Sequence, residues 1–392
     1  MCLELCCVVL LSGFPASSLW QAPASGFVSI RSAPEHPIIE LQSDRQLVNF
    51  DLIVENSSQQ TWRISQIELD AYDKMHELVL RKSVNTDAFS PSIAVIGAQV
   101  LAPGGTLDIF NPFYEFGPAV SLDELKYSFC LVHESNLQEA EKNKHRLPDD
   151  CDMRQAGTVL PRQYDEKTAL ILPLRGRIFV WEGHDFYAHH LRVPLGSPKV
   201  QAMGITANSN EFASDFIYLD AQGRTHQDDA RKLENWYSYG KPVYAPGSGV
   251  VLDAANDIPE NSFEDAAGTK IGYPKLAPGK DPKDIGNFVL IDHEDGEYSL
   301  LVHMKPDSVA VKRGDRVKLG QQIGRIGFTG DSIFPHLHYS LMDGRELFQA
   351  WGLPAYFSDF RRVLGSRSVK VSRDTVNSGD FLESYAVYSN AK

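Results

Sequence analysis

The sequence predicts a mainly β protein with two domains, and three observations support this prediction. Residues 27–135 contain short segments in which apolar and polar residues alternate with a period of two, as in half-buried strands. Residues 136–160 are largely polar and charged, and we interpret them as a linker. From residue 161 onward, glycine and β-branched residues dominate in runs that tight-turn signals separate.

The first domain, residues 27–135, is predicted to be an immunoglobulin-like β-sandwich. The stretches "LVNFDLIVEN" and "WRISQIELDAYD" alternate apolar and polar residues, and "LKYSFCLV" gives a further strand near the end of the domain. Several short strands with turns between them and no long helical period are typical of such sandwiches. No cluster of acids, bases or nucleophiles stands out in this half. We therefore interpret it as a binding or spacing module.

Composition and charge narrow the class of partner. The 392 residues suffice for two domains, and 43% hydrophobic and 23% charged residues are ordinary for a soluble globular protein. The net charge of −13 argues against nucleic acid, whose phosphates would be repelled. No run of Lys and Arg suggests a membrane contact, and we expect no stable membrane span. The oligomeric state cannot be read from the sequence.

Residues 1–26 resemble a secretory signal peptide. The apolar stretch from about Leu5 to Leu11 is too short to span a bilayer, and small residues follow it. The basic residues that usually precede such a stretch are missing. We expect export to the periplasm or the extracellular space. The alternative is a retained N-terminus, either unstructured or packed in the core.

The cysteines leave two possibilities open. Three of the five lie in the predicted signal peptide, so Cys130 and Cys151 remain. Two cysteines are compatible with one disulfide in an oxidising compartment. The alternative is that they are unrelated, because Cys130 lies in the apolar run "YSFCLV" and could be a core residue.

The stretch "FPHLHYSL", residues 334–341, places two histidines on one face of a predicted strand. Side chains alternate across a β-strand, so residues i and i+2 share a face. One face would carry the polar residues His336, His338 and Ser340. The other face would carry the apolar residues Leu337, Tyr339 and Leu341. The apolar set suits a core, so the polar set requires either water or a chemical role.

Four segments, read in order, resemble a known enzyme family. They are "NEFASDFIYLD", "GKPVYAPGSGVV", "YSLLVHM" and "GRIGFTGDSIFPHLHYSL". Together they are similar to the LytM/lysostaphin-type zinc metallopeptidases, which cut peptide cross-links in bacterial cell walls. The resemblance covers roughly residues 165–345. It implies a LytM-type (duplicated hybrid motif) antiparallel β-sheet domain over residues 161–392, in which the Asp-, Pro- and Gly-rich segment 253–286 is an inserted surface loop.

The resemblance also implies the roles of four residues. Asp215 and His338 would bind Zn²⁺, which keeps an open position for water in catalytic sites. His303 and His336 would be the catalytic residues that orient this water and stabilise the developing oxyanion. The implied activity is a zinc endopeptidase acting on peptidoglycan peptides. The alternative is a catalytically degenerate relative that binds the wall or regulates another hydrolase; each residue taken alone could instead be structural.

One departure from the family pattern leaves the third metal ligand open. The family's first metal motif is H-x-x-x-D, commonly with glycine in the middle, whereas this chain has Glu211 and Ala213 at the matching positions. Residues four apart on a straight strand are separated by roughly 13 Å, too far for one ion. Glu211 could still reach the metal if the chain bulged between it and Asp215.

We predict that His190, in the stretch "GHDFYAHHLRV", supplies the third ligand. On a regular strand His189 would share the more apolar face with Leu191 and Val193. His190 would then lie on the side more open to a cleft. Glu211 and His189 remain competitors, and the third possibility is a structural histidine pair that binds nothing.

Overall fold

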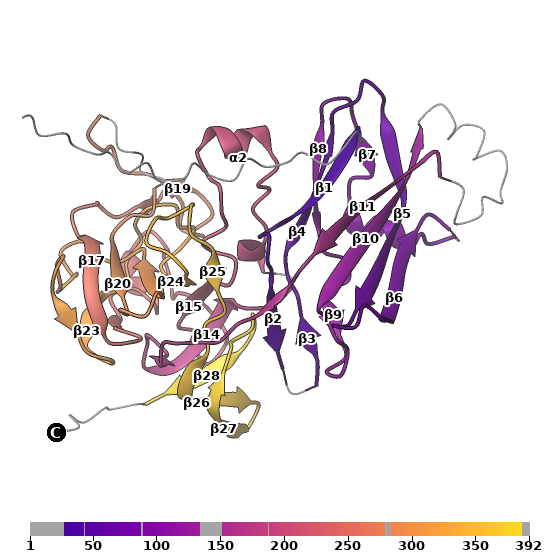
Figure 1. Cartoon of the computed structure of the whole chain (residues 1–392). Helices are drawn as coiled ribbons and strands as arrows, with labels where there is room; N and C mark the ends of the chain where they lie inside the picture. The colour runs from indigo at the N-terminus through magenta and orange to yellow at the C-terminus, as the bar shows by residue number, and fades with distance from the viewer. Residues whose placement is uncertain are drawn as a thin grey trace, which may run out of the picture.

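The computed structural model describes residues 27–42, 44–87, 89–133, 151–186, 188–278, 281 and 284–385. These residues form two β-rich parts that lie side by side (Figure 1). The predicted mainly β fold class is confirmed. The predicted signal peptide lies outside the described residues, as does most of the predicted linker. Within the described ranges, no helix has the length and apolar character needed to cross a bilayer.

The N-terminal part is a sandwich of two antiparallel sheets. One sheet has the order β1 (Val28–Ala33), β4 (Asp51–Asn56) and β8 (Thr106–Phe110). The other has the order β11 (Met153–Val159), β10 (Glu124–His133), β5 (Trp62–Tyr72) and β6 (Leu78–Asn85), with β7 (Val100–Leu101) on β5. Apolar side chains from both sheets, including Leu52 and Ile67, form one buried cluster. An immunoglobulin-like relationship of this sandwich stays a prediction.

Part of the predicted linker is a strand. β11 pairs antiparallel with β10, from Leu125 opposite Val159 to Leu131 opposite Met153. Its side chains alternate between half-buried and exposed, because it lies at the edge of the sheet, and the polar exposed residues conceal the strand in the sequence. A disulfide joins Cys130 to Cys151, so of the two possibilities for these cysteines the structure contains the bridge.

A small sheet connects the two parts. It has the order β12 (Arg162–Gln163), β2 (Ile38–Leu41), β3 (Gln46–Leu47) and β9 (Glu115–Phe116). β12 runs parallel to β2. The chain therefore passes from the sandwich to the C-terminal part along a strand that is paired to the first part.

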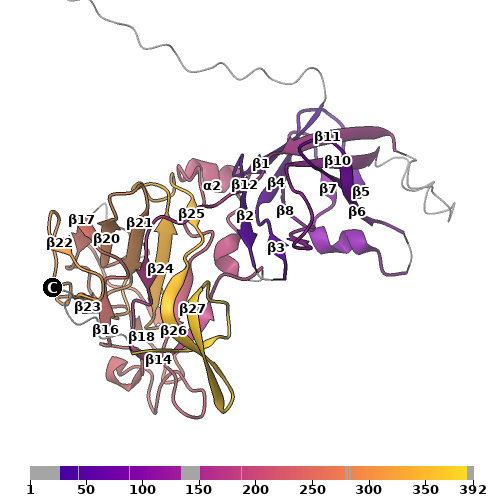
Figure 2. The ribbon, with the colours of Figure 1, turned by 60° about the horizontal axis from the view of Figure 1, so that its bottom comes forward.

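One large sheet organises the C-terminal part. Its path is β13 (Leu170–Ile171), β26 (Phe357–Leu364), β28 (Phe381–Ser384), β14 (Gly176–Glu182), β15 (Ser214–Ile217), β24 (Leu337–Met342), β21 (Tyr298–Val302), β20 (Phe288–Asp292), β17 (Gly249–Ala255) and β22 (Arg316–Val317). β25 (Gly352–Leu353) pairs with β24, and β27 (Arg367–Asp374) with β26. Figure 2 shows β20, β21 and β24 next to one another.

Short elements complete the C-terminal part. Two small hairpin sheets are β16 (Pro242–Tyr244) with β23 (Gln322–Arg325), and β18 (Ser262–Phe263) with β19 (Ile271–Gly272). The helical turns are η1 (Ser92–Ile96) in the sandwich and then η2 (His189–Leu191), α2 (Pro198–Ala202) and η3 (Leu233–Asn235).

The segment predicted as an inserted loop, 253–286, is partly ordered into strands. β17 continues to Ala255, and the β18–β19 hairpin buries Phe263 against Trp236 and Phe328. The two faces predicted for β24 are found in the structure. Its apolar residues enter the largest core cluster, and they are Leu337, Tyr339 and Leu341.

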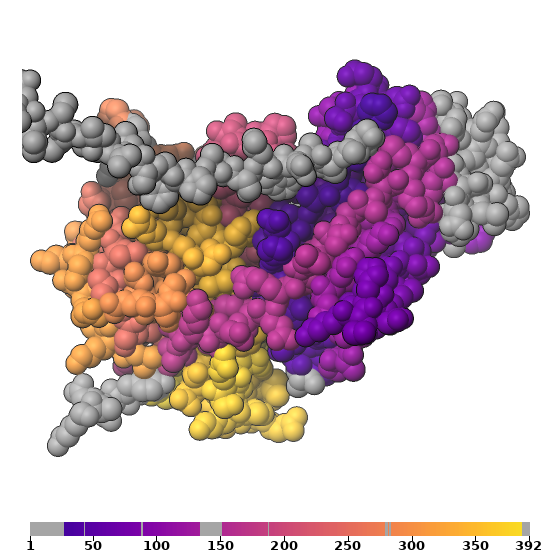
Figure 3. Space-filling model, in the orientation of Figure 1, coloured from indigo at the N-terminus to yellow at the C-terminus, as the bar shows by residue number. Residues whose placement is uncertain are grey.

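The two parts pack against each other along a seam (Figure 3), where Ala33 and Ile53 of the first part and Leu195 of the second form a buried apolar cluster. His184 of the C-terminal part contacts the carboxylate of Glu40 through its Nε2. The backbone N–H of Gly196 donates to Asp108 Oδ1 at 2.7 Å, and the guanidinium of Arg192 lies over the Phe110 ring. Every one of these contacts from the C-terminal part comes from the segment between β14 and β15. The first part therefore holds that connection in place.

A buried carboxyl at this seam makes stability depend on pH. Burial, with the nearby Asp108, raises the pKa of Asp51 from 3.8 to about 7, although Arg192 opposes the shift. The folded protein keeps this proton up to about pH 7, whereas the unfolded chain releases it near pH 4. The free energy of unfolding contributed by this group therefore falls as the pH rises from about 4 to about 7.

We expect Asp51→Asn to flatten the loss of stability between pH 4 and pH 8. The amide resembles the protonated carboxyl, so at pH 8 the variant should be more stable than the parent by up to about 4 kcal/mol. Urea unfolding followed by tryptophan fluorescence at several pH values measures this. The exposed Asp87→Asn is the matched control and should leave the pH profile unchanged. An identical profile for Asp51→Asn would contradict the burial argument.

Candidate active site

The centre of the candidate site is a pair of side chains on neighbouring strands. Asp215 on β15 lies directly opposite His338 on β24, so both side chains project from the same face of the sheet. Asp215 Oδ1 is 2.9 Å from His338 Nδ1. The other ring nitrogen, Nε2, is 3.0 Å from Ser340 Oγ, and Ser340 donates to Asn210 Oδ1 at 3.2 Å. This series of contacts fixes the orientation of the His338 ring, with Nδ1 directed at Asp215.

His336 and His303 lie beside this pair with one nitrogen each held by the backbone. His336 Nδ1 donates to the carbonyl of Phe334 at 2.8 Å, which leaves Nε2 3.5 Å from Asp215 Oδ1. His303 follows β21 with a φ of 62°, an uncommon value for a residue with a side chain. Its Nδ1 donates to the carbonyl of Thr329 at 2.8 Å, and its ring centroid is 4.7 Å from that of His336. Both rings therefore present Nε2 as a lone pair.

His190 completes the cluster from the connection between β14 and β15. Its Nε2 is 3.6 Å from Asp215 Oδ2, and its ring centroid is 4.7 Å from that of His338. Its Nδ1 is buried and has no hydrogen-bond partner among the described residues. The carbonyl of His190 accepts a hydrogen bond from the Asn208 side chain at 2.8 Å, which anchors this turn.

The strand predicted around His189 and His190 is wrong. These residues form the 3₁₀ turn η2, in which successive side chains are about 120° apart rather than on opposite faces. The alternation used to choose between them therefore does not apply. His190 is 8% exposed and lies in the cluster, whereas His189 is exposed and its Nδ1 is 3.3 Å from Glu182 Oε1.

Glu211, the competing third ligand, faces the domain seam instead. The chain turns between Asn208 and Ala213, and β15 begins only at Ser214, so Glu211 is not on the strand that carries Asp215. Burial raises the pKa of Glu211 well above its ordinary value, and the nearby carboxylates raise it further; these belong to Asp51, Glu40 and Asp343.

Comparisons with known proteins identify the family of this chain. Residues 235–349 match peptidase family M23. The lipoprotein NlpD of Yersinia enterocolitica is 30% identical over 104 residues, which are 26% of this chain and 79% of that protein. The chain belongs to peptidase family M23. The LytM/lysostaphin-type relationship predicted from the sequence is thereby confirmed.

Two further similarities cover different shares of the two proteins compared. The peptidoglycan DD-endopeptidase ShyA of Vibrio cholerae is 32% identical over 103 residues, 26% of this chain and 18% of ShyA. This chain thus matches about a fifth of the length of that relative. The solved catalytic domain of lysostaphin from Staphylococcus simulans is 25% identical, covering 35% of this chain and 71% of that domain with a TM-score of 0.22.

The electrostatics of the M23 cluster favour neutral imidazoles around one carboxylate. Burial lowers the pKa of His190 to about 3, and burial also lowers the pKa of His303 and His336. Burial alone would raise the pKa of Asp215, but the surrounding histidines bring it below its ordinary range. An ionised carboxylate with neutral imidazoles around it is the donor set of a zinc site.

An aromatic row extends from the cluster across the same face of the sheet. Phe179 on β14 lies opposite Ile217, two residues beyond Asp215, so its ring shares the face of that carboxylate. Ring contacts link Phe179 to Trp181 at 6.5 Å and Trp181 to Phe334 at 5.1 Å. Phe334 is itself 5.5 Å from the ring of His336.

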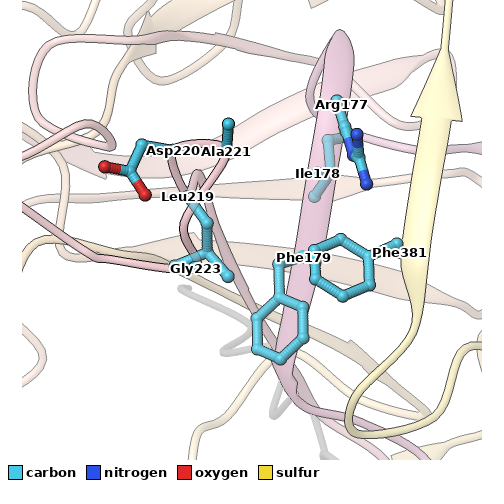
Figure 4. A pocket seen from close by; sticks show the side chains of 8 residues that line it. All are labelled: Arg177, Ile178, Phe179, Leu219, Asp220, Ala221, Gly223 and Phe381. Atoms are coloured by element: carbon cyan, nitrogen blue, oxygen red, sulfur yellow. The ribbon is translucent and has the colours of Figure 1, made fainter. Parts of the chain in front are cut away.

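The row ends at a pocket of about 270 Å³. Figure 4 shows Phe179 and Phe381 on one side of this pocket and Asp220 on the other. The two rings lie 4.8 Å apart. Trp181, between this pocket and His336, is 41% exposed, which is unusual for so large an apolar side chain.

Sequence reasoning missed several residues that shape the site. Ser340 was placed on the correct face but received no role, and its contact with His338 follows from the same i, i+2 spacing. Asn210 and Glu182 gave no signal, because their contacts depend on how the connection between β14 and β15 folds back on the sheet.

The tautomers of two histidines can be tested directly. Because the Phe334 and Thr329 carbonyls accept from Nδ1, we expect His336 and His303 to be neutral Nδ1–H tautomers in the metal-free protein. Long-range ¹H–¹⁵N NMR spectra distinguish the two ring nitrogens. Exposed His76, on the first part, is the reference for a ring without such a carbonyl. Nε2–H forms at His303 and His336 would contradict the arrangement.

Proposed function

We propose that this protein is a zinc-dependent endopeptidase that cleaves peptide bonds in bacterial cell-wall peptidoglycan. The observation that carries the proposal is that ring nitrogens of His190 and His338 lie within 3.6 Å of the Asp215 carboxylate, with the rings of His336 and His303 beside them. Membership of family M23 and the names of relatives such as ShyA support a peptidoglycan substrate.

Three residues would hold the metal. His190 offers Nε2, His338 offers Nδ1 and Asp215 offers a carboxylate oxygen, which is the ligand number of a catalytic zinc site with an open position. The contacts from Ser340 and Asn210 would orient His338, as hydrogen-bond partners of metal-binding histidines commonly do. When bound, zinc supplies Lewis acidity and a water of lowered pKa.

His336 and His303 would handle the proton. Each has Nδ1–H fixed on a backbone carbonyl, so Nε2 is positioned to accept the proton of the attacking water. Once protonated, the same Nε2–H is a donor that can stabilise the oxyanion or deliver the proton to the leaving amine. Their burial keeps both rings neutral before the reaction, as a base requires.

The alternative of a catalytically degenerate module rested on the glutamate at position 211. Because His190 supplies a donor from another segment, the replacement of the family's histidine does not leave the cluster short of ligands. We therefore favour the enzyme over the regulator.

We also propose that the protein acts outside the cytoplasm, in the periplasm or the extracellular space. The Cys130–Cys151 disulfide supports this location, since such bridges persist in oxidising compartments. A wall substrate requires it as well.

Single substitutions separate the metal-binding residues from the catalytic ones. We expect His338→Ala and His190→Ala to lose zinc, because each removes a donor. His336→Ala and His303→Ala should keep about one zinc per chain and lose peptide hydrolysis by about 10²-fold or more. Elemental analysis measures zinc, and release of peptides from purified peptidoglycan measures activity.

Glu211→Gln is the control for the metal ligands. It retains the shape of the side chain at the seam and should keep both zinc and activity. If it alone released zinc, the assignment of His190 would be wrong. If parent protein reconstituted with zinc bound none, the proposal of a zinc enzyme would fail.

The aromatic row should contribute to substrate binding. We expect Trp181→Ala to raise KM several-fold while kcat changes little, because the ring lies between the pocket and His336 but touches no candidate catalytic nitrogen. Steady-state hydrolysis of soluble wall fragments measures this. Phe89→Ala, at an exposed ring of the first part, is the control. Equal KM values for both variants would exclude the row from the binding surface.

A further inference from the structure

The cluster contains one more metal donor than the proposed enzyme requires. Besides His190 and Asp215, His189 offers a ring nitrogen, and the ligand atoms of these three residues lie within 4.8 Å of one another. The ring centroids of His189 and His190 are 4.0 Å apart. The 3₁₀ turn η2 thus directs two consecutive imidazoles toward the same carboxylate.

His189 is oriented even though it is exposed. Its Nδ1 is 3.3 Å from Glu182 Oε1, and its backbone N–H donates to Glu182 Oε2 at 3.3 Å. Glu182 is itself the residue of β14 that pairs with Asp215. A carboxylate on one ring nitrogen is the usual way in which proteins orient a metal-binding histidine, and it leaves Nε2 as the free donor.

We propose that His189 is a fourth, exchangeable ligand of the metal, which occupies through Nε2 the position that the catalytic form keeps open for water. This inference rests on the proposed zinc enzyme and adds a resting state to it. In that state the ion would have His189, His190, Asp215 and His338 as ligands, a closed tetrahedral set.

The surroundings of the four donors explain why only His189 can be exchanged. His190, Asp215 and His338 are each at least 92% buried and are held by neighbouring strands or by Asn208. The side chain of His189 is 66% exposed, and besides the ring of His190 it contacts Glu182 near the surface. Such an exposed contact is weak, so the ring can leave when a substrate carbonyl enters.

The decisive experiment counts the imidazoles on the metal in the full chain. Zinc-loaded protein is compared with His189→Ala by ¹⁵N NMR of the histidine rings, with X-ray absorption at the zinc edge as a second readout. We expect three zinc-bound imidazoles in the parent and two in the variant. The variant should also bind zinc about tenfold or more weakly in a chelator competition, yet hydrolyse peptidoglycan faster when saturated with zinc.

Two further variants complete the test. Glu182→Ala should give part of the same effect, because it frees the ring without removing it, and His76→Ala, at an exposed histidine of the first part, should give none. Two zinc-bound imidazoles in the parent, with zinc affinity unchanged in His189→Ala, would overturn the inference and leave the proposed enzyme intact. Parent protein that binds no zinc would overturn the proposed function itself.

Discussion

The buried carboxylate of Asp215 is the constraint on which the candidate site depends. An ionised group in the interior is costly unless charges or hydrogen bonds compensate it. Here His338 approaches one oxygen at 2.9 Å and His190 the other at 3.6 Å, with His336 at 3.5 Å. His336 and His338 come from one stretch at the start of β24, whereas Asp215 lies on β15 and His190 on the connection before it. The cluster therefore forms only when these segments come together in the folded sheet, and no single segment contains it.

The strand face that carries this constraint could be predicted from the sequence. The period-two pattern of β24 separates the histidines from the apolar residues, and the register of β15 against β24 then brings Asp215 opposite His338. The alternation follows from the residues themselves, and the family resemblance implied that Asp215 and His338 bind one metal, whereas the register is a finding of the structure. The alternation and the resemblance required no knowledge of how the loops fold.

The loops could not be predicted, for two physical reasons. The connection before β15 has no regular alternation of apolar and polar residues, so the strand predicted around His190 was wrong. His190 nevertheless lies in the cluster. Glu211 was a competitor because it occupies the position of the histidine in the family's H-x-x-x-D motif. The chain instead turns at Asn208–Ala213 and places its carboxyl at the seam. The edge strand β11 was missed because its exposed side chains are polar.

The first part of the protein does more than space the second. The connection that delivers His190 is held by Glu40 through His184, by Asp108 through the backbone of Gly196, and by Phe110 under Arg192. All three anchors belong to the sandwich side of the seam. If the third metal ligand came from the strand that carries Asp215, the sheet alone would fix the distance between the two ligands. Here the donor lies some 25 residues upstream of Asp215 in the sequence, on a connection without long secondary structure. The position of that donor relative to Asp215 therefore depends on the docking of the two parts, so the seam is a structural component of the candidate metal centre.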